Sequence, residues 1–152
     1  MPPSRRLRKP LVSDGTSIRE HGKVARLQPR PGECVVAFWI DHPDFRTAFE
    51  LQAGPGCDGL FLYKAPGARP LLLLVELKGS GLPKAVEQLG NTLEVLKSSF
   101  PLPPGQYRAV VVTDRGVPTQ EKGRLVDFER RHKMRLEVSR DGDLRRFIRD
   151  SQ

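Results

Sequence analysis

The chain of 152 residues is long enough for one domain with its own hydrophobic core. Lysine and arginine number 26 against 18 acidic residues, so the formal net charge is +8 at pH 7 and the pI is about 10.0. The apolar runs are too short for a signal peptide or a bilayer span, and the cysteines lack the Cys-x-x-Cys spacing of a zinc site. We therefore expect a cytoplasmic protein that makes no membrane contact and binds a polyanion such as nucleic acid.

The amino-terminal end is predicted to differ from the rest of the chain. Residues 1–10 are rich in Pro, Ser and Arg, a composition typical of disordered segments. We expect a disordered basic arm over residues 1–10 and a single domain over residues 11–152. The cations of this arm are candidates for nucleic-acid binding: Arg5, Arg6, Arg8 and Lys9.

The first part of the domain contains one clear strand and two weaker signals. Residues 24–27 are ambiguous and fit a short edge strand. Residues 33–40 combine β-branched and aromatic side chains, which predicts a strand. Residues 45–51 have the spacing of a short helix.

A β-hairpin is predicted next, from apolar runs at 57–63 and 71–79 that flank a turn with Pro and Gly. Asp58 and Glu76 each lie nine residues from Gly67. A turn centred on this glycine places the two acids opposite each other, with Cβ atoms about 5 Å apart. Opposed carboxylates destabilise a sheet unless a cation lies between them, and Mg²⁺ needs only one or two protein carboxylates. We interpret the pair as a candidate metal site, with an ordinary surface hairpin as the alternative.

Helices and strands alternate after the hairpin. Helices are expected at 83–98, 118–132 and 144–150, and strands at 107–113 and 134–138. The first of these helices has a buried stripe of Leu82, Val86, Leu89, Leu93 and Leu96. The second has the inward-facing residues Leu125, Val126 and Phe128. This order predicts an α/β domain with a mixed central β-sheet flanked by helices.

The pattern Asp58…Glu76-Leu77-Lys78 resembles the active-site signature of the PD-(D/E)XK nuclease superfamily, which has the restriction-endonuclease-like fold. Gln88, on the helix after the Glu-x-Lys strand, matches a position where these nucleases often carry a polar residue. The resemblance implies that Asp58, Glu76 and the carbonyl group of Leu77 hold Mg²⁺, or Mn²⁺ in its place. It also implies that Lys78 positions the attacking water and that Gln88 supports the site.

The likeness covers about residues 55–115, and its departures from the family pattern leave alternatives open. The residue before Asp58 is Cys57 rather than proline, whereas a literal Pro-Asp pair ends at Asp44. We prefer Asp58, because Asp44 precedes a short helix and is better explained as its cap. Glu50 is the candidate for the extra glutamate that the family's first helix often supplies, with a solvated surface glutamate as the alternative.

These observations predict a metal-dependent nuclease that hydrolyses phosphodiester bonds of DNA, with RNA as the alternative substrate. Lys84, at the start of the helix after the hairpin, joins the amino-terminal cations as a candidate nucleic-acid contact. The alternative function is a non-catalytic nucleic-acid-binding or assembly subunit that retains the fold, which a complete Asp–Glu–Lys set disfavours. A homodimer or a larger complex is compatible with the sequence, but no interface is legible in it.

Overall fold

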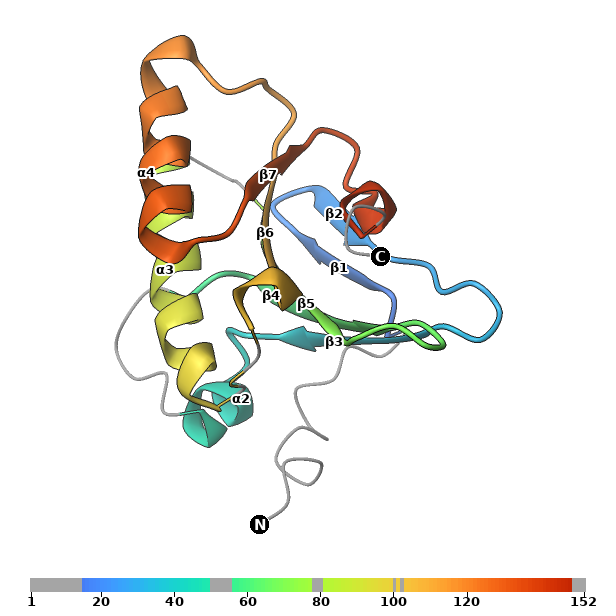
Figure 1. Ribbon diagram of the computed structural model, residues 1–152. Coiled ribbons are helices and arrows are strands. Elements are labelled where there is room, and N and C mark those ends of the chain that lie inside the picture. The colour runs from blue at the N-terminus through green and yellow to red at the C-terminus, as the bar shows by residue number, and fades with distance from the viewer. Residues whose placement is uncertain (1–14, 50–55, 78–80, 100, 102, 149–152) are drawn as a thin grey trace.

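The computed structural model describes residues 15–49, 56–77, 81–99, 101 and 103–148, and within them a five-stranded sheet forms the centre (Figure 1). The strands, in order across the sheet, are β3 (Cys34–Trp39), β4 (Gly59–Lys64), β5 (Leu71–Leu77), β6 (Tyr107–Val112) and β7 (Leu136–Ser139). β3, β4 and β5 pair antiparallel, whereas β5, β6 and β7 pair parallel. The predicted mixed sheet is therefore confirmed.

The β4–β5 hairpin has the register that was expected from the sequence. Gly59 pairs with Val75 and Tyr63 pairs with Leu71, so the turn centres on Gly67. This glycine has a φ of 71°, a left-handed conformation that favours glycine. β5 is buried along its whole length because it is paired on both sides and covered on both faces.

Helices cover one face of the sheet. α3 (Leu82–Ser99) and α4 (Lys122–His132) pack together there, and the short helix α2 (Pro43–Ala48) joins the same layer (Figure 1). The buried residues of α3 repeat at helical spacing: Leu82, Ala85, Leu89, Thr92, Leu93 and Leu96. Phe128 of α4 and Leu74 of β5 belong to the same core, so one apolar layer joins the helices to the sheet.

A second β-hairpin covers the opposite face, where helices were expected. It pairs β1 (Ser17–Glu20) with β2 (Lys23–Arg26), and the 3₁₀ helix η3 (Leu144–Phe147) lies beside it (Figure 1). Only part of β2 was expected from the sequence. Ile18 packs so closely on Gly59 that a Cβ on the glycine would lie 1.8 Å from the isoleucine Cδ1. A larger residue at the first position of β4 would therefore require the Ile18 side chain to move.

The region of α4 differs from expectation in three ways. A 3₁₀ helix, η2 (Thr119–Glu121), precedes α4, so the α-helix begins at Lys122 rather than at 118. Val126 was predicted to face inward, but 52% of it is exposed because Phe128 and Leu125 fill the side that packs on the core. Lys133, the C-cap of α4, has a φ of 54°. β7 begins at Leu136, two residues later than the predicted strand at 134–138.

The carboxyl-terminal helix is also shorter than expected. The predicted helix at 144–150 is the single 3₁₀ helix η3, and residues 149–152 lie outside the described residues. Another 3₁₀ helix, η1 (Pro104–Gln106), leads into β6. None of the helices in the described part of the chain is long and apolar enough to cross a membrane.

Candidate functional site

Asp58 and Glu76 lie together at one end of the β4–β5 hairpin. Asp58 directly precedes β4 and Glu76 is the next-to-last residue of β5, so the register, continued by one pair, sets them opposite each other. The backbone N–H of Leu77 donates a hydrogen bond of 2.6 Å to Oδ2 of Asp58. Side chains alternate along β5: Leu74 packs in the helix-side core, and Leu77 packs in the core beneath the β1–β2 hairpin. Glu76 therefore shares the face of Leu74, on the side of α3.

Both carboxyl groups are removed from water. Asp58 is 4% exposed and Glu76 is 6% exposed, and Oε2 of Glu76 has no hydrogen-bond partner among the described residues. Burial raises the pKa of Glu76 to about 9, and repulsion from Asp58 adds to this effect. Burial also raises the pKa of Asp58 to about 7, with a contribution from a hydrogen bond with Glu20 and an opposing one from the N–H of Leu77. A buried polar atom without a partner costs on the order of 1–3 kcal/mol, so this arrangement is unfavourable for stability.

Two further acidic side chains line the same cavity, which has a volume of about 300 Å³. Glu20 is the last residue of β1, and Asp41 follows β3. Repulsion from each of them raises the pKa of both Asp58 and Glu76. Neither residue was predicted from the sequence to lie at the site, because each lies in a segment that reaches it only when the chain folds over the sheet.

Helix α3 holds the segment that precedes Asp58. Nε2 of Gln88 donates a hydrogen bond of 3.2 Å to the carbonyl oxygen of Gly56, and the N–H of Cys57 donates one of 2.8 Å to Oγ1 of Thr92. The Thr92 hydroxyl in turn donates to the carbonyl oxygen of Gln88 at 2.8 Å. Gln88 lines the cavity and contacts the backbone next to Asp58. Thr92 was not predicted from the sequence, where its only signal is its place on the buried side of the helix.

Two groups that can carry positive charge also line the cavity. Lys84, in the first turn of α3, has an exposed side chain there. His21 comes from the turn of the β1–β2 hairpin, where it and Gly22 have φ values of 52° and 72°. Positive φ at both residues of a two-residue turn is typical of tight hairpins, so this turn directs the end of β1 toward the cavity.

The remaining predicted site residues are accounted for as follows. Lys78 and Glu50 lie outside the described residues, as do the cations of the amino-terminal arm: Arg5, Arg6, Arg8 and Lys9. The prediction that Asp44 caps the short helix is wrong. The N-cap of α2 is His42, whose Nδ1 accepts a hydrogen bond of 3.2 Å from the N–H of Asp44, because the helix begins at Pro43, two residues earlier than predicted. Asp44 is not among the described residues that line the cavity.

The carboxylates of Asp58 and Glu76 are suitable ligands for a hard divalent cation. Mg²⁺ binds oxygen and keeps several of its waters, so two protein carboxylates are sufficient. Asp58 and Glu76 provide these, and one buried oxygen of Glu76 is not used by any described residue. Within the described ranges, no group of three or more His, Cys, Asp or Glu side chains is already arranged to hold an ion. Any bound cation would therefore complete its coordination with water or with backbone oxygen.

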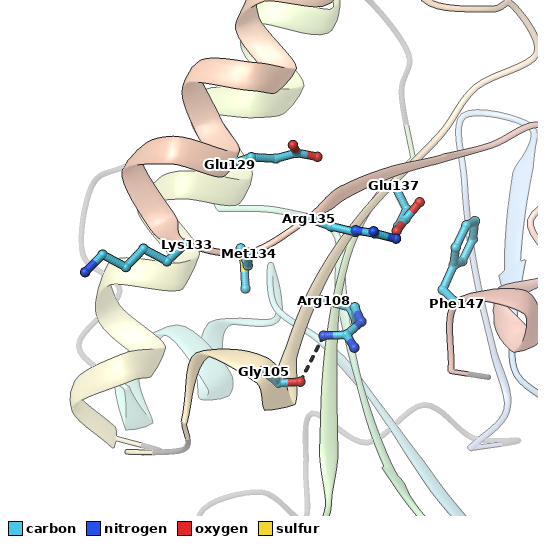
Figure 2. Close-up of a pocket in the computed structure, with 8 residues that line it drawn as sticks. All are labelled: Gly105, Arg108, Glu129, Lys133, Met134, Arg135, Glu137 and Phe147. Atoms are coloured by element: carbon cyan, nitrogen blue, oxygen red, sulfur yellow. Dashed lines mark hydrogen bonds between the residues drawn. The ribbon is translucent and has the colours of Figure 1, made fainter. Parts of the chain in front are cut away.

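A larger cavity, of about 630 Å³, lies toward the amino-terminal ends of β6 and β7 (Figure 2). Its charged groups include Arg108 and Glu129, and both already have protein partners. Arg108 donates to the carbonyl oxygen of Gly105 at 2.9 Å, and Glu129 accepts from the N–H of Leu136 at 3.2 Å. Among the described residues, this cavity contains no buried side-chain polar atom without a partner. The carboxylate pair is therefore the stronger candidate for chemistry.

Comparisons with protein-family models, with curated proteins and with solved structures found no match for this chain.

Proposed function

We propose that this chain is a metal-dependent nuclease with a restriction-endonuclease-like fold, which hydrolyses phosphodiester bonds. The observation that carries the proposal is the buried pair of Asp58 and Glu76, with the unpartnered Oε2 of Glu76. Two adjacent acids in a water-poor site destabilise a fold unless a cation joins them. Strongly raised carboxyl pKa values in a cavity are characteristic of functional sites.

The order of the elements supports the proposed fold. The Glu-x-Lys segment begins on the second strand of an antiparallel hairpin, a helix follows, and the chain then returns as a strand parallel to β5. This is the order that the resemblance to the PD-(D/E)XK superfamily implies. Here a β-hairpin, rather than a further helix, covers the second face of the sheet.

Each residue of the site has a proposed role. Asp58 and Glu76, with the carbonyl oxygen of Leu77, would hold Mg²⁺ or Mn²⁺. A divalent cation bound there would lower the pKa of a water ligand and stabilise charge on the phosphate. Lys78, directly after β5, would orient the attacking water, and Gln88 would fix the backbone before Asp58 through its hydrogen bond to Gly56.

The positive net charge of the chain favours a negatively charged substrate. A net charge of +8 favours a polyanion, because lysine and arginine neutralise phosphates and release counterions. Lys84, exposed beside the cavity, would contact a phosphate near the scissile bond. Arg5, Arg6, Arg8 and Lys9 would add contacts with phosphates. The proposed polyanion is DNA, with RNA as the alternative.

The test is a cleavage assay with labelled single- and double-stranded DNA and RNA, each with Mg²⁺, Mn²⁺ or EDTA. We expect the wild type to cut DNA with either metal and not with EDTA, and we expect Asp58→Asn to be inactive. Binding without cleavage under all these conditions would reject the enzyme and favour a non-catalytic binding or assembly subunit.

A further inference from the structure

Two arginines lie next to each other where β6 and β7 begin. In the β6–β7 register Ala109 pairs with Leu136, and the register continued by one pair sets Arg108 opposite Arg135. Leu136 packs in the helix-side core, whereas Val110 packs in the core beneath the β1–β2 hairpin. Because side chains alternate along a strand, both arginines lie on the hairpin side of the sheet. Neighbouring strands are about 4.8 Å apart, so the two positive charges repel each other unless an anion joins them.

Both arginines line the larger cavity, of about 630 Å³ (Figure 2). Nη1 of Arg108 donates hydrogen bonds of 2.9 Å to the carbonyl oxygens of Gly105 and Tyr107. These two acceptors are uncharged, so they fix the guanidinium group without neutralising it. Arg135 is exposed, and among the described residues its side chain has neither a hydrogen-bond partner nor an ion-pair partner. Lys133, the exposed C-cap of α4, adds a third cation to the wall of the cavity.

The other groups of the cavity narrow the class of ligand. Glu137 lies two residues after Arg135 and on the same face of β7, where its charge disfavours a bare anion but can accept hydrogen bonds from hydroxyl or amino groups. Phe147 of η3 provides an aromatic wall, and Figure 2 shows its ring on the side toward which Arg135 and Glu137 extend. Such a ring stacks on a nucleobase. Arginine holds phosphate through parallel N–H donors, and a cavity of this volume accepts a ligand of nucleotide size.

This cavity is separate from the carboxylate pair. Arg108 pairs with Leu73 of β5, three residues before Glu76. Glu76 faces α3, whereas Arg108 lies on the hairpin side of the sheet. A ligand between the two arginines would therefore lie on the opposite face of the sheet from the carboxylate pair.

We propose that the cavity bounded by β6, β7, α4 and η3 binds a nucleotide, whose phosphate group is held by Arg108 and Arg135. Its base would stack on Phe147, and Glu137 would accept a hydrogen bond from a hydroxyl or amino group. The nucleotide is either free or one unit of a nucleic-acid strand, because both present the same phosphate. The inference goes beyond the proposed function and does not depend on it, since it involves neither carboxylate of the pair nor a divalent cation.

The test is isothermal titration calorimetry on the full chain in EDTA, with deoxyadenosine monophosphate, deoxyadenosine and a short single-stranded DNA as separate probes. The proteins are the wild type, Arg135→Gln, Arg135→Lys and the control Arg124→Gln. Arg124 is an exposed residue of α4 that lines a different cavity. Arg135 is exposed as well, so its replacement should leave the fold intact.

We expect the wild type to bind the monophosphate, and to bind deoxyadenosine at least about 10-fold more weakly because the charge-assisted hydrogen bonds are lost. Arg135→Gln should bind the monophosphate about 10-fold or more weakly than the wild type. Arg135→Lys should recover only part of the affinity, since lysine lacks the parallel donors. Arg124→Gln should bind like the wild type.

The DNA probe distinguishes the two sources of the nucleotide. Weaker DNA binding by Arg135→Gln than by Arg124→Gln would support a site for one unit of a strand, whereas a loss confined to the monophosphate would support a free nucleotide. Equal affinities of Arg135→Gln and Arg124→Gln for both probes would overturn the inference. Deoxyadenosine bound as tightly as the monophosphate would overturn it as well, as would a wild type that binds neither the monophosphate nor DNA.

Discussion

Replacement of Glu76 by glutamine should stabilise the protein at neutral and alkaline pH. The pKa of Glu76 in the folded protein is about 9, against an ordinary value of 4.5, because burial and the charge of Asp58 disfavour its ionised form. The folded protein therefore retains a proton that the unfolded chain releases. The stability that this proton provides is complete below pH 4.5 and is lost as the pH rises toward 9. Asp58, with a pKa of about 7 against 3.8, acts in the same direction at lower pH.

The size of the effect follows from these pKa values. Within the window, each pH unit costs about 1.4 kcal/mol for one such group. Between pH 5 and pH 8, Glu76 alone should lower the unfolding free energy of the wild type by about 4 kcal/mol. Glutamine has nearly the same shape and cannot ionise. Glu76→Gln should therefore match the wild type at pH 5 and exceed its stability by about 2–4 kcal/mol at pH 8.

Urea denaturation followed by circular dichroism, in EDTA and at constant ionic strength, measures this difference. The unfolding free energy should decrease with urea concentration at the same slope in both proteins, so that a difference in midpoint reports a difference in stability. Glu137 lies on β7 and lines the larger cavity, so Glu137→Gln serves as the control for the loss of one acidic residue elsewhere. A wild-type unfolding free energy that stays constant or rises from pH 5 to pH 8 would refute the electrostatic reasoning.

Three further predictions concern the α3 contacts, the lysine after β5 and the basic arm. Thr92→Val leaves the buried N–H of Cys57 without its acceptor, so the unfolding free energy should fall by about 1–3 kcal/mol. Thr92→Ser keeps the hydroxyl and should stay close to the wild type. Urea denaturation measures the difference, and a Thr92→Val variant as stable as the wild type would contradict the role of the hydroxyl. Lys78→Ala should have the melting temperature of the wild type and should still bind nucleic acid. In single-turnover assays, however, it should cut at least about 10²-fold more slowly than the wild type. Full activity in that variant would remove the lysine from the mechanism. Deletion of residues 1–10 should weaken DNA binding and flatten its salt dependence without abolishing cleavage, as measured by fluorescence anisotropy over a salt series. Binding that is insensitive to salt would argue against contacts with phosphates.

The sequence predicted the central hairpin and its acid pair because both depend on local pattern. Two apolar runs and a turn around Gly67 determine the register, and the register alone places Asp58 opposite Glu76. The buried stripe of α3 is likewise readable from its spacing, which also places Gln88 near the site.

The rest of the site depends on long-range packing, which the local pattern does not contain. β1 has only four residues, and its position is decided by the contact between Ile18 and Gly59, which are distant in the chain. The sequence around Glu20 therefore contains no signal that places this residue at the site. The same holds for Thr92, whose hydroxyl serves Cys57 only because α3 lies across the end of β4.

The central claim is that Asp58 and Glu76 hold a divalent cation that promotes phosphodiester hydrolysis. Its most direct test is the initial rate of DNA cleavage as a function of Mg²⁺ concentration, for wild type and Glu76→Gln purified in parallel and shown to be folded. We predict a saturable dependence on Mg²⁺ for the wild type and no cleavage above the EDTA background for Glu76→Gln. Equal cleavage by the two proteins would contradict the claim.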